Sequence, residues 1–388
     1  KPCWACAGLR SLFCLCFLLA GIHANIPCPH DSNRQNTWNV FFSPISITGT
    51  LAMLALGAKL ETLHQILRVL GFNPEGIQEE EVHDSFCHLM QKLNHQTNGI
   101  ELNMGNVMFV TEELQLLQQF RNNLNIVCGE EIFPVNFRYT KEAEKKINRY
   151  VNEKTNGKIV QLVDNIDQLT EILLVSFIYF KGKTSGWEKQ FDHKYTKERD
   201  FFVDKNTVIK VPMMFQMRMF KYGYDKQLSS TVLQMDYKGG ATAFFVLPDR
   251  GQMQKLEKEH SDIGLKCLII FLHSSLDRLV RVYLPKFSLT EKYELKGMLN
   301  RMGIIDLFTD KADLSGMTGT PKHRVSEAIH KAMVKVHESG TEAAAGTAME
   351  IVPMSAPPTI EFNSSFLFFI QYEGNVLFLG KIITPKDD

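Results

Sequence analysis

The sequence predicts a single globular domain of the α+β class. The chain has 388 residues, of which 44% are hydrophobic, and this supplies enough apolar surface for a large core. Helical spacing of apolar residues occurs in the first half of the sequence, whereas runs typical of strands dominate its middle and end. No internal repeat and no linker divides the sequence. The 43 basic and 43 acidic residues balance, so the charge predicts neither nucleic acid nor membrane as a partner.

The first 24 residues differ from the rest of the chain. Lys1 and Arg10 flank an apolar stretch that starts at Leu12, and the segment ends on the small residue Ala24. This order is typical of a secretory signal peptide, and the apolar run is too short to span a bilayer. We predict that residues 1–24 are a leader and that residues 25–388 form one secreted, extracellular domain. A buried N-terminal helix is the alternative.

The cysteine pattern predicts neither a disulfide framework nor a structural metal site. Four of the eight cysteines lie in the predicted leader, whose Cys-x-x-Cys has no second pair to complete a zinc site. We predict no metal and no cofactor, and at least one thiol that is free or paired elsewhere. The remaining four cysteines are Cys28, Cys87, Cys128 and Cys267.

Common catalytic motifs are absent from the body of the sequence, which has no His-Glu-x-x-His and no Gly-x-Ser-x-Gly. Residues 182–184 imitate the end of a phosphate-binding loop, but Phe177 stands where that loop needs its first glycine. Nothing local supports a catalytic triad. The sequence therefore predicts a protein that is not an enzyme.

Two segments of the first half have helical periodicity. Apolar residues recur at helical spacing over 63–70, and Gly71 follows as a stop signal. A second stripe covers 143–151 and is surrounded by basic residues. Such a face could bind a polyanion, but acidic neighbours at 142 and 144 favour a solvated, ion-paired surface.

Strand patterns follow from the middle of the chain onward. Apolar runs or alternation cover 241–247, 280–284 and 331–336. Two further apolar runs, 366–370 and 376–379, are separated by the turn sequence Glu-Gly-Asn. Together with the two helices, these strands support the α+β class.

The segment from Gly340 to Pro358 has the pattern of a strand but the composition of a loop. Small or apolar residues alternate with two glutamates, and no proline occurs from Thr341 to Val352, so the segment could enter the middle of a sheet. Three consecutive alanines and the flanking glycines have low strand propensity, because their small side chains give little packing. About ten ladder hydrogen bonds at roughly 0.5–1.5 kcal/mol each would form on insertion, comparable with the stability of a whole domain. Either this loop becomes a strand, or it is a flexible surface loop.

From Val40 to its end the sequence resembles the serpin family, and most closely the α1-antitrypsin branch. Six motifs in family order carry the resemblance: Phe42-Ser43-Pro44-Ile45-Ser46-Ile47, Thr155-Asn156-Gly157-Lys158-Ile159, Phe180-Lys181-Gly182-Lys183, Ala312-Asp313-Leu314-Ser315-Gly316, Ala328-Ile329-His330-Lys331-Ala332 and Phe362-Asn363-Ser364-Ser365-Phe366.

The resemblance implies a serpin fold of three β-sheets, about eight or nine helices and an exposed reactive-centre loop at about 338–358. It implies suicide inhibition: a trypsin-fold serine protease cleaves Met354-Ser355 as an acyl-enzyme, and the freed loop inserts between the third and fifth strands of the large sheet. Met354, with Val352 and Pro353 before it, suits elastase- or chymotrypsin-like proteases. The hinge of the loop would be Gly340, Thr341, Glu342, Ala343, Ala344, Ala345, Gly346 and Thr347.

The resemblance also implies a polar cluster beneath the large sheet and a tryptophan at its end. The residues matching these positions are Ser43, Ser46, Ser176, Trp187 and His330. Ser176 stands where the family usually has asparagine, which predicts a loss of hydrogen-bonding capacity. The inserted residues Thr184-Ser185-Gly186 are expected to displace Trp187.

Another departure is the short stretch of about fifteen residues between the predicted leader and Val40, from which we expect the first helix of the family to be missing. Two alternatives to the inhibitor follow: a non-inhibitory carrier of a hormone or small ligand, and an inactive truncated serpin. Asn363 heads a glycosylation sequon in a segment that packs into a sheet in the family, so we expect it unmodified. Glutamates at 79–81 predict no strong heparin site, and we expect a monomer.

Overall fold

The computed structural model describes residues 38–74, 100–124, 131–182, 186–259, 277–338 and 356–386. The predicted signal peptide, the stretch from which the first helix is expected to be missing, and the acidic segment 79–81 lie outside these residues. Within them, no helix combines the length and the apolar character needed to cross a membrane.

The described residues form seven α-helices and two 3-10 helices. The helices predicted over 63–70 and 143–151 are present: the first begins three residues earlier and ends at Val69, and the second extends three residues further at each end. The helix after Ser43 is buried nearly all round, so it carries no amphipathic stripe, and proline at its first position fits the helix start. The elements are α2 (Pro44–Gly57), α3 (Leu60–Val69), α5 (Gln118–Asn123), α6 (Thr140–Lys154), η2 (His193–Tyr195), α7 (Met253–Glu259), α9 (Leu295–Arg301), η3 (Asp306–Phe308) and α10 (Ser315–Thr318).

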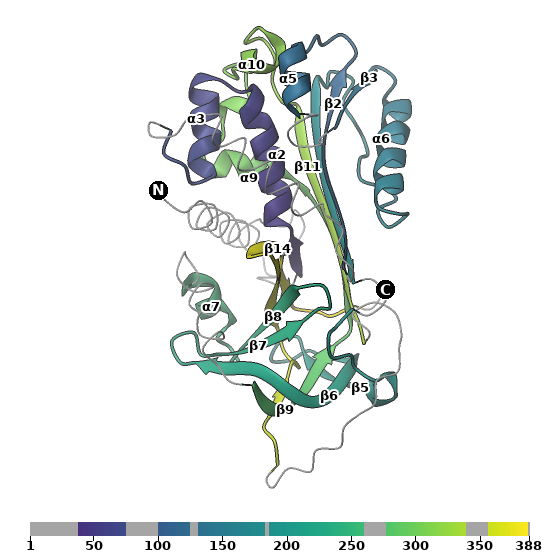
Figure 1. The fold of residues 1–388 in the computed structure, drawn as a ribbon, viewed down its shortest axis with the longest axis vertical. Helices are drawn as coiled ribbons and strands as arrows, with labels where there is room; N and C mark the ends of the chain where they lie inside the picture. The colour runs from purple at the N-terminus through teal and green to yellow at the C-terminus, as the bar shows by residue number, and fades with distance from the viewer. Residues whose placement is uncertain are drawn as a thin grey trace.

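A five-stranded sheet, called the large sheet below, runs along most of the length of the molecule (Figure 1). Its order is β10-β11-β4-β2-β3, and its two inner neighbours β11 and β4 run parallel. Helix α2 lies on one side of it and α6 on the other (Figure 1). Its strands are β10 (Phe287–Glu294), β11 (Glu327–Val336), β4 (Ile172–Gly182), β2 (Ile100–Thr111) and β3 (Glu131–Val135).

Nine further strands form two sheets that share the 18-residue strand β6. The second sheet has the order β1-β14-β13-β8-β7-β6, and the third sheet joins β5, β9 and β12 to the earlier part of β6. With the large sheet, this gives the three sheets expected. The bounds are β1 (Val40–Phe42), β5 (Lys197–Phe202), β6 (Val208–Asp225), β7 (Ser230–Asp236), β8 (Ala241–Pro248), β9 (Asp277–Pro285), β12 (Thr359–Glu361), β13 (Phe366–Tyr372) and β14 (Asn375–Ile382).

The predicted strands all lie within observed ones. The turn between β13 and β14 has positive φ at Glu373 (50°) and Gly374 (77°), as a tight two-residue hairpin requires. The hairpin brings two apolar strands together in the middle of the second sheet, which explains their burial.

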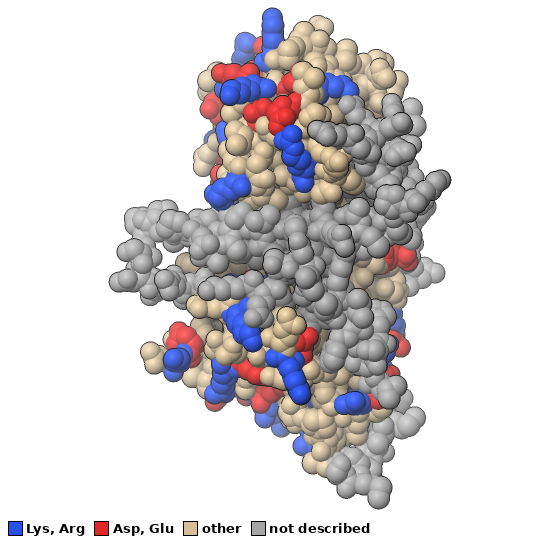
Figure 2. Space-filling model, turned by 90° about the vertical axis from the view of Figure 1, so that its left-hand side faces the viewer, with Lys and Arg blue, Asp and Glu red and all other residues tan. Residues whose placement is uncertain are grey.

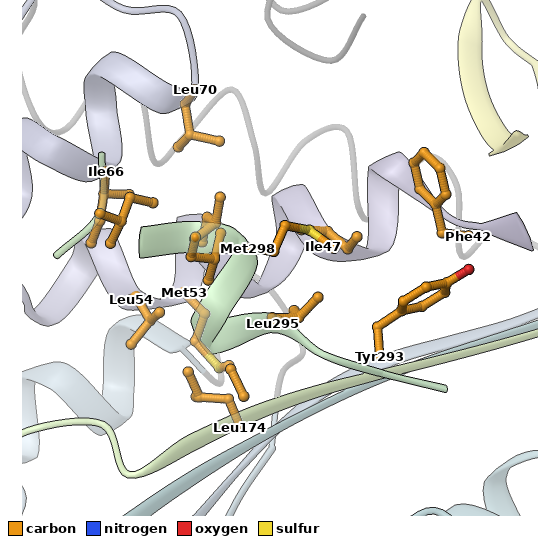
Figure 3. Close-up of a cluster of buried hydrophobic side chains, with 14 of the residues drawn as sticks. Phe42, Ile47, Met53, Leu54, Ile66, Leu70, Leu174, Tyr293, Leu295 and Met298 are labelled. Carbon is orange, nitrogen blue, oxygen red and sulfur yellow. The ribbon is translucent and has the colours of Figure 1, made fainter. Parts of the chain in front are cut away.

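The core fills both faces of the large sheet. On one face, Met53 and Leu54 of α2, Ile66 of α3 and Met298 of α9 pack over Leu174 of β4 (Figure 3). On the other face, the apolar stripe of α6 packs on β2 and β4. The large sheet is therefore held between helices, and its centre can accommodate polar groups only where these find partners.

Candidate functional site

The candidate site is the seam between β4 and β11. The two strands pair directly in a parallel register from Leu173 opposite Glu327 to Phe180 opposite Val334. Because they run in the same direction, a segment that leaves the end of β11 and folds back would be antiparallel to both. The residues that follow β11 in the sequence beyond Glu338 are the predicted loop. The seam thus has the geometry to accept one more strand.

The predicted loop residues themselves lie outside the described residues. This applies to the reactive bond Met354-Ser355, to its flank Val352 and Pro353, and to the whole hinge from Gly340 to Thr347. Their positions stay predictions. The residues predicted to lie beneath and at the end of the sheet are described, and they fall into two groups.

The first group, the central polar row, crosses the large sheet in register. Tyr293 lies opposite His330, His330 opposite Ser176, and Ser176 opposite Asn106, on four neighbouring strands. The row meets the first turn of α2, where Ser43 is the N-cap. Three sequence-predicted residues, Ser43, Ser176 and His330, are therefore brought together.

His330 is the centre of this row and is fully buried. The backbone N–H of Ser43 donates to its Nε2 at 3.1 Å, and the Ser176 hydroxyl lies 2.8 Å from its Nδ1. Burial lowers the pKa of His330 to about 3, so the ring is neutral near pH 7. Since Nε2 accepts a hydrogen bond, the ring hydrogen is on Nδ1 and is donated to Ser176.

Ser46 joins this row through backbone rather than side-chain contacts. Its N–H donates to the Ser43 hydroxyl at 3.3 Å, and its carbonyl lies 3.3 Å from the hydroxyl of Thr50. The Thr50 hydroxyl also lies 3.1 Å from Asn106 Oδ1. Among the described residues the buried Ser46 hydroxyl has no hydrogen-bond partner.

Tyr293 and Asn106 are the members of the row that sequence reasoning missed, and Asn106 bears on the predicted loss at Ser176. The chain has Ser176 where asparagine is usual in the family, yet an asparagine amide lies on the adjacent strand directly opposite. A Cβ at Gly49 would approach Asn106 Nδ2 to 2.2 Å, so α2 presses closely on this amide. A buried polar residue in a strand was the available signal, but its pairing partner could not be read from the sequence.

The second group, the end cluster, lies where β11 ends and contains Trp187, Glu338, Lys286, His193 and Thr196. Trp187 is fully buried, donates its indole N–H to the carbonyl of His337 at 2.9 Å, and stacks on Tyr237 with ring centroids 4.1 Å apart. The tryptophan is packed at the end of β11 although three residues are inserted before it. It fixes the point at which the chain leaves β11.

Glu338 was not predicted from the sequence, and it is only 2% exposed. Its carboxylate accepts a hydrogen bond from the Thr196 hydroxyl at 2.8 Å, with His193 Nδ1 at 3.3 Å and Lys286 Nζ at 3.4 Å. Burial acts to raise its pKa, but its backbone amide, the Thr196 hydroxyl, Lys286 and His193 outweigh burial and lower the pKa. Glu338 is therefore ionised, and it anchors the chain at the start of the predicted loop.

Surface charge gives little indication of a polyanion site. Blue and red side chains are interspersed over the described residues on the face in Figure 2. On α6, Lys141 pairs with Glu144 at 2.9 Å and Lys154 with Glu131 at 2.6 Å, consistent with a solvated face. In the described part of the chain, no group of three potential ligands could hold a metal ion.

Comparison with known proteins shows which family has this architecture. Residues 30–385 match the family model for Serpin (serine protease inhibitor). The chain is 44% identical over 359 residues to alpha-1-antiproteinase 2 of Equus caballus, covering 92% of this chain and 84% of that protein. It is likewise 44% identical to alpha-1-antiproteinase of Bos taurus, with 92% and 85% covered.

Solved structures give the same picture. Human glycosylated kallistatin superposes with a TM-score of 0.88 at 36% identity, with 100% of both chains covered. Human thyroxine-binding globulin complexed with thyroxine superposes with a TM-score of 0.87 at 33% identity, covering 99% of this chain and 100% of that one.

Proposed function

This chain belongs to the serpin family, and we propose that it is a secreted, monomeric inhibitor that traps an elastase- or chymotrypsin-like serine protease after cleavage at Met354-Ser355. The family is one of inhibitors rather than enzymes, and similar proteins are named antiproteinases. Secretion rests on the predicted leader at residues 1–24, followed by one domain over 25–388.

The observation that carries the proposal is the parallel seam of β4 and β11. A strand inserted there replaces one parallel pairing by two antiparallel ones, so the sheet gains a full set of ladder hydrogen bonds. The segment that follows β11 has one small or apolar face suited to such a strand. Cleavage would release it, and the stored free energy would drive insertion.

Within the central polar row, the contact between His330 and Ser176 holds β11 against β4, and we call this contact the latch. Opening the seam separates His330 of β11 from Ser176 of β4, and it exposes the buried imidazole to the inserting loop. Inserting the loop therefore requires the broken bond to be offset by the new ladder. We propose that the latch keeps the uncleaved protein in its five-stranded state.

The proposed specificity follows from Met354. An unbranched apolar side chain fits pockets of elastase or chymotrypsin type and lacks the cation that an acidic pocket prefers. Val352 and Pro353 suit an extended cleft.

A matched pair of hinge variants tests the mechanism. Ala343 belongs to the face predicted to enter the core, and Ala344 to the opposite face. Mixed with elastase and chymotrypsin, the wild type is expected to form a covalent band in denaturing electrophoresis, with Met354 as the acylated residue. Ala343→Arg should be cleaved without a stable complex because a buried arginine blocks insertion, whereas Ala344→Arg should still trap. Cleavage of the wild type without a complex would refute the inhibitor.

A second candidate is a carrier of a hydrophobic small ligand, supported by the likeness to thyroxine-binding globulin. Equilibrium titration with thyroxine tests it. Saturable binding together with failure of the wild type to trap any protease would favour the carrier, and the absence of both would favour an inactive serpin.

A further inference from the structure

The sequence contains one Asn-x-Ser/Thr acceptor sequence for N-linked glycans, Asn363-Ser364-Ser365. No other asparagine among the 388 residues has serine or threonine two positions after it. Any N-linked glycan on this chain would therefore have to be attached to Asn363. From the sequence we expect this residue to be unmodified, because the matching segment packs into a sheet in the family. The surroundings of Asn363 in the structure favour the opposite conclusion.

Asn363 lies in the connection between β12 and β13, outside both strands. Strand β12 ends at Glu361, and β13 begins at Phe366. Phe362 is fully buried in the core, whereas the three residues of the acceptor sequence are each partly exposed. The packing of this segment into a sheet therefore begins only after the acceptor sequence has ended.

The backbone of Asn363 is held by hydrogen bonds, while its side chain faces water. Its N–H donates to the carbonyl of Glu361 at 2.9 Å, and its carbonyl accepts from the N–H of Phe202, the last residue of β5, at 2.8 Å. Among the described residues its carboxamide makes no hydrogen bond, and it is not one of the buried polar groups that lack a partner. A carboxamide sealed from water without a partner would cost about 1–3 kcal/mol. This one is satisfied by solvent.

A carboxamide in this state has the chemistry of a glycan acceptor. In N-glycosylation the asparagine Nδ2 forms a bond to the anomeric carbon of an oligosaccharide, and the bond from that carbon to a lipid-linked diphosphate breaks. The lipid diphosphate leaves with the electron pair, and a base of the transferase takes up the proton that Nδ2 loses. The co-reactant is the lipid-linked oligosaccharide of the secretory compartment. The folded chain has only to leave Nδ2 open to solvent.

A sugar on Asn363 would stand away from the path of the predicted loop. Its backbone partner Phe202 lies six residues beyond Thr196, which belongs to the end cluster at the exit of β11. Six residues of extended strand cover about 20 Å. A glycan at the far end of β5 is therefore compatible with entry of the loop into the seam between β4 and β11.

We propose that Asn363 carries an N-linked oligosaccharide in the secreted protein. The inference rests on the proposed function in one respect, since secretion through the predicted leader brings the chain to the compartment where such glycans are transferred. It does not depend on the inhibitory mechanism, because the acceptor sequence lies outside the loop and outside the seam.

The test expresses the full chain in cultured mammalian cells and treats secreted and intracellular protein with an amidase that releases N-linked glycans, in heavy-oxygen water. Release converts a glycosylated asparagine into aspartate with the heavy isotope, which mass spectrometry detects in the peptide around Asn363. The wild type is expected to move to lower mass in denaturing electrophoresis and to carry the label. Ser365→Ala breaks the acceptor sequence and should lose both signals, whereas the matched change Ser364→Ala preserves it and should retain them.

A parallel expression separates the glycan from the leader by replacing residues 1–24 with the signal peptide of an unrelated secreted protein. A glycan in both expressions upholds the proposal, and a glycan only with the substituted leader upholds the site while refuting secretion through residues 1–24. Unlabelled Asn363 with the substituted leader overturns the proposal. Label that persists equally in Ser365→Ala also overturns it, because that label then arises from deamidation. Covalent trapping at Met354-Ser355, measured on the same material, judges the inhibitor independently.

Discussion

The central polar row and the end cluster both lie along the β4–β11 seam, but they hold it by different chemistry. In the row, the fully buried His330 is neutral and is bound by the Ser43 amide and the Ser176 hydroxyl. In the end cluster, Glu338 is ionised and is held by Thr196, Lys286 and His193, and the last two keep contact with water. Uncharged groups are tolerated in the middle of the sheet, whereas charge appears only where solvent is near.

The largest expected effect comes from Glu338→Ala in the end cluster. Removing the carboxylate takes away the buried group on which Thr196 and Lys286 converge and should lower the free energy of unfolding by about 3 kcal/mol, the low end for a broken buried pair. Urea unfolding measures this, with Glu153→Ala on the exposed side of α6 as a control expected to change it by less than about 0.5 kcal/mol. Equal effects of the two variants would show that the end cluster does not hold the sheet.

The next largest effect is a change in the free energy of unfolding with pH, and it differs between the central polar row and the end cluster. Burial depresses the folded-state pKa of His330 to about 3 from an ordinary 6.5, so between these values the unfolded chain binds more protons and stability falls as pH falls. The expected loss between pH 7 and pH 5 is about 2 kcal/mol. The lowered pKa of Glu338 adds a further loss only below about pH 4.5.

The variant His330→Gln provides the comparison for this measurement. Its unfolding free energy should be lower at pH 7 but nearly flat between pH 7 and pH 5. If its pH dependence in that window equalled that of the wild type, another group would be responsible.

The smallest effect is expected for Ser176→Ala. This change removes one hydrogen bond to the buried imidazole and should cost about 1–2 kcal/mol. If the row is a latch, the same variant should also insert its loop faster after cleavage, measured by the rate of fluorescence change. A slower rate at reduced stability would contradict the latch.

Sequence reasoning predicted the elements with clear periodicity better than it predicted their contacts. The amphipathic helices α3 and α6 and the alternating strand β11 have patterns that follow from one buried side. Helix α2 is buried nearly all round and has no such pattern, so only its motif pointed to it. The strand β6 was missed because its buried side changes along its 18 residues.

The site was predictable to a similar degree. His330, Ser176 and Ser43 could be named from motifs, but their register with Asn106 depends on strands brought together by the whole fold. Glu338 reads in the sequence as an ordinary acidic residue before a loop, and its burial follows from Thr196, His193 and Lys286, which are distant in the chain. Local sequence contains no signal for such convergence.

The parallel pairing of β4 and β11 also affects how the protein is made. Ser176 and its partner His330 are 154 residues apart, so during synthesis at about 5–20 residues per second the edge of β4 waits about 8–30 s for its neighbour. Pairing over such a separation slows folding because loop-closure entropy is lost before contacts form. An unpaired hydrophobic strand edge is a template for other chains. Nascent chains on the same messenger RNA can therefore pair with one another through the unpaired edge of β4 before β11 has been synthesised.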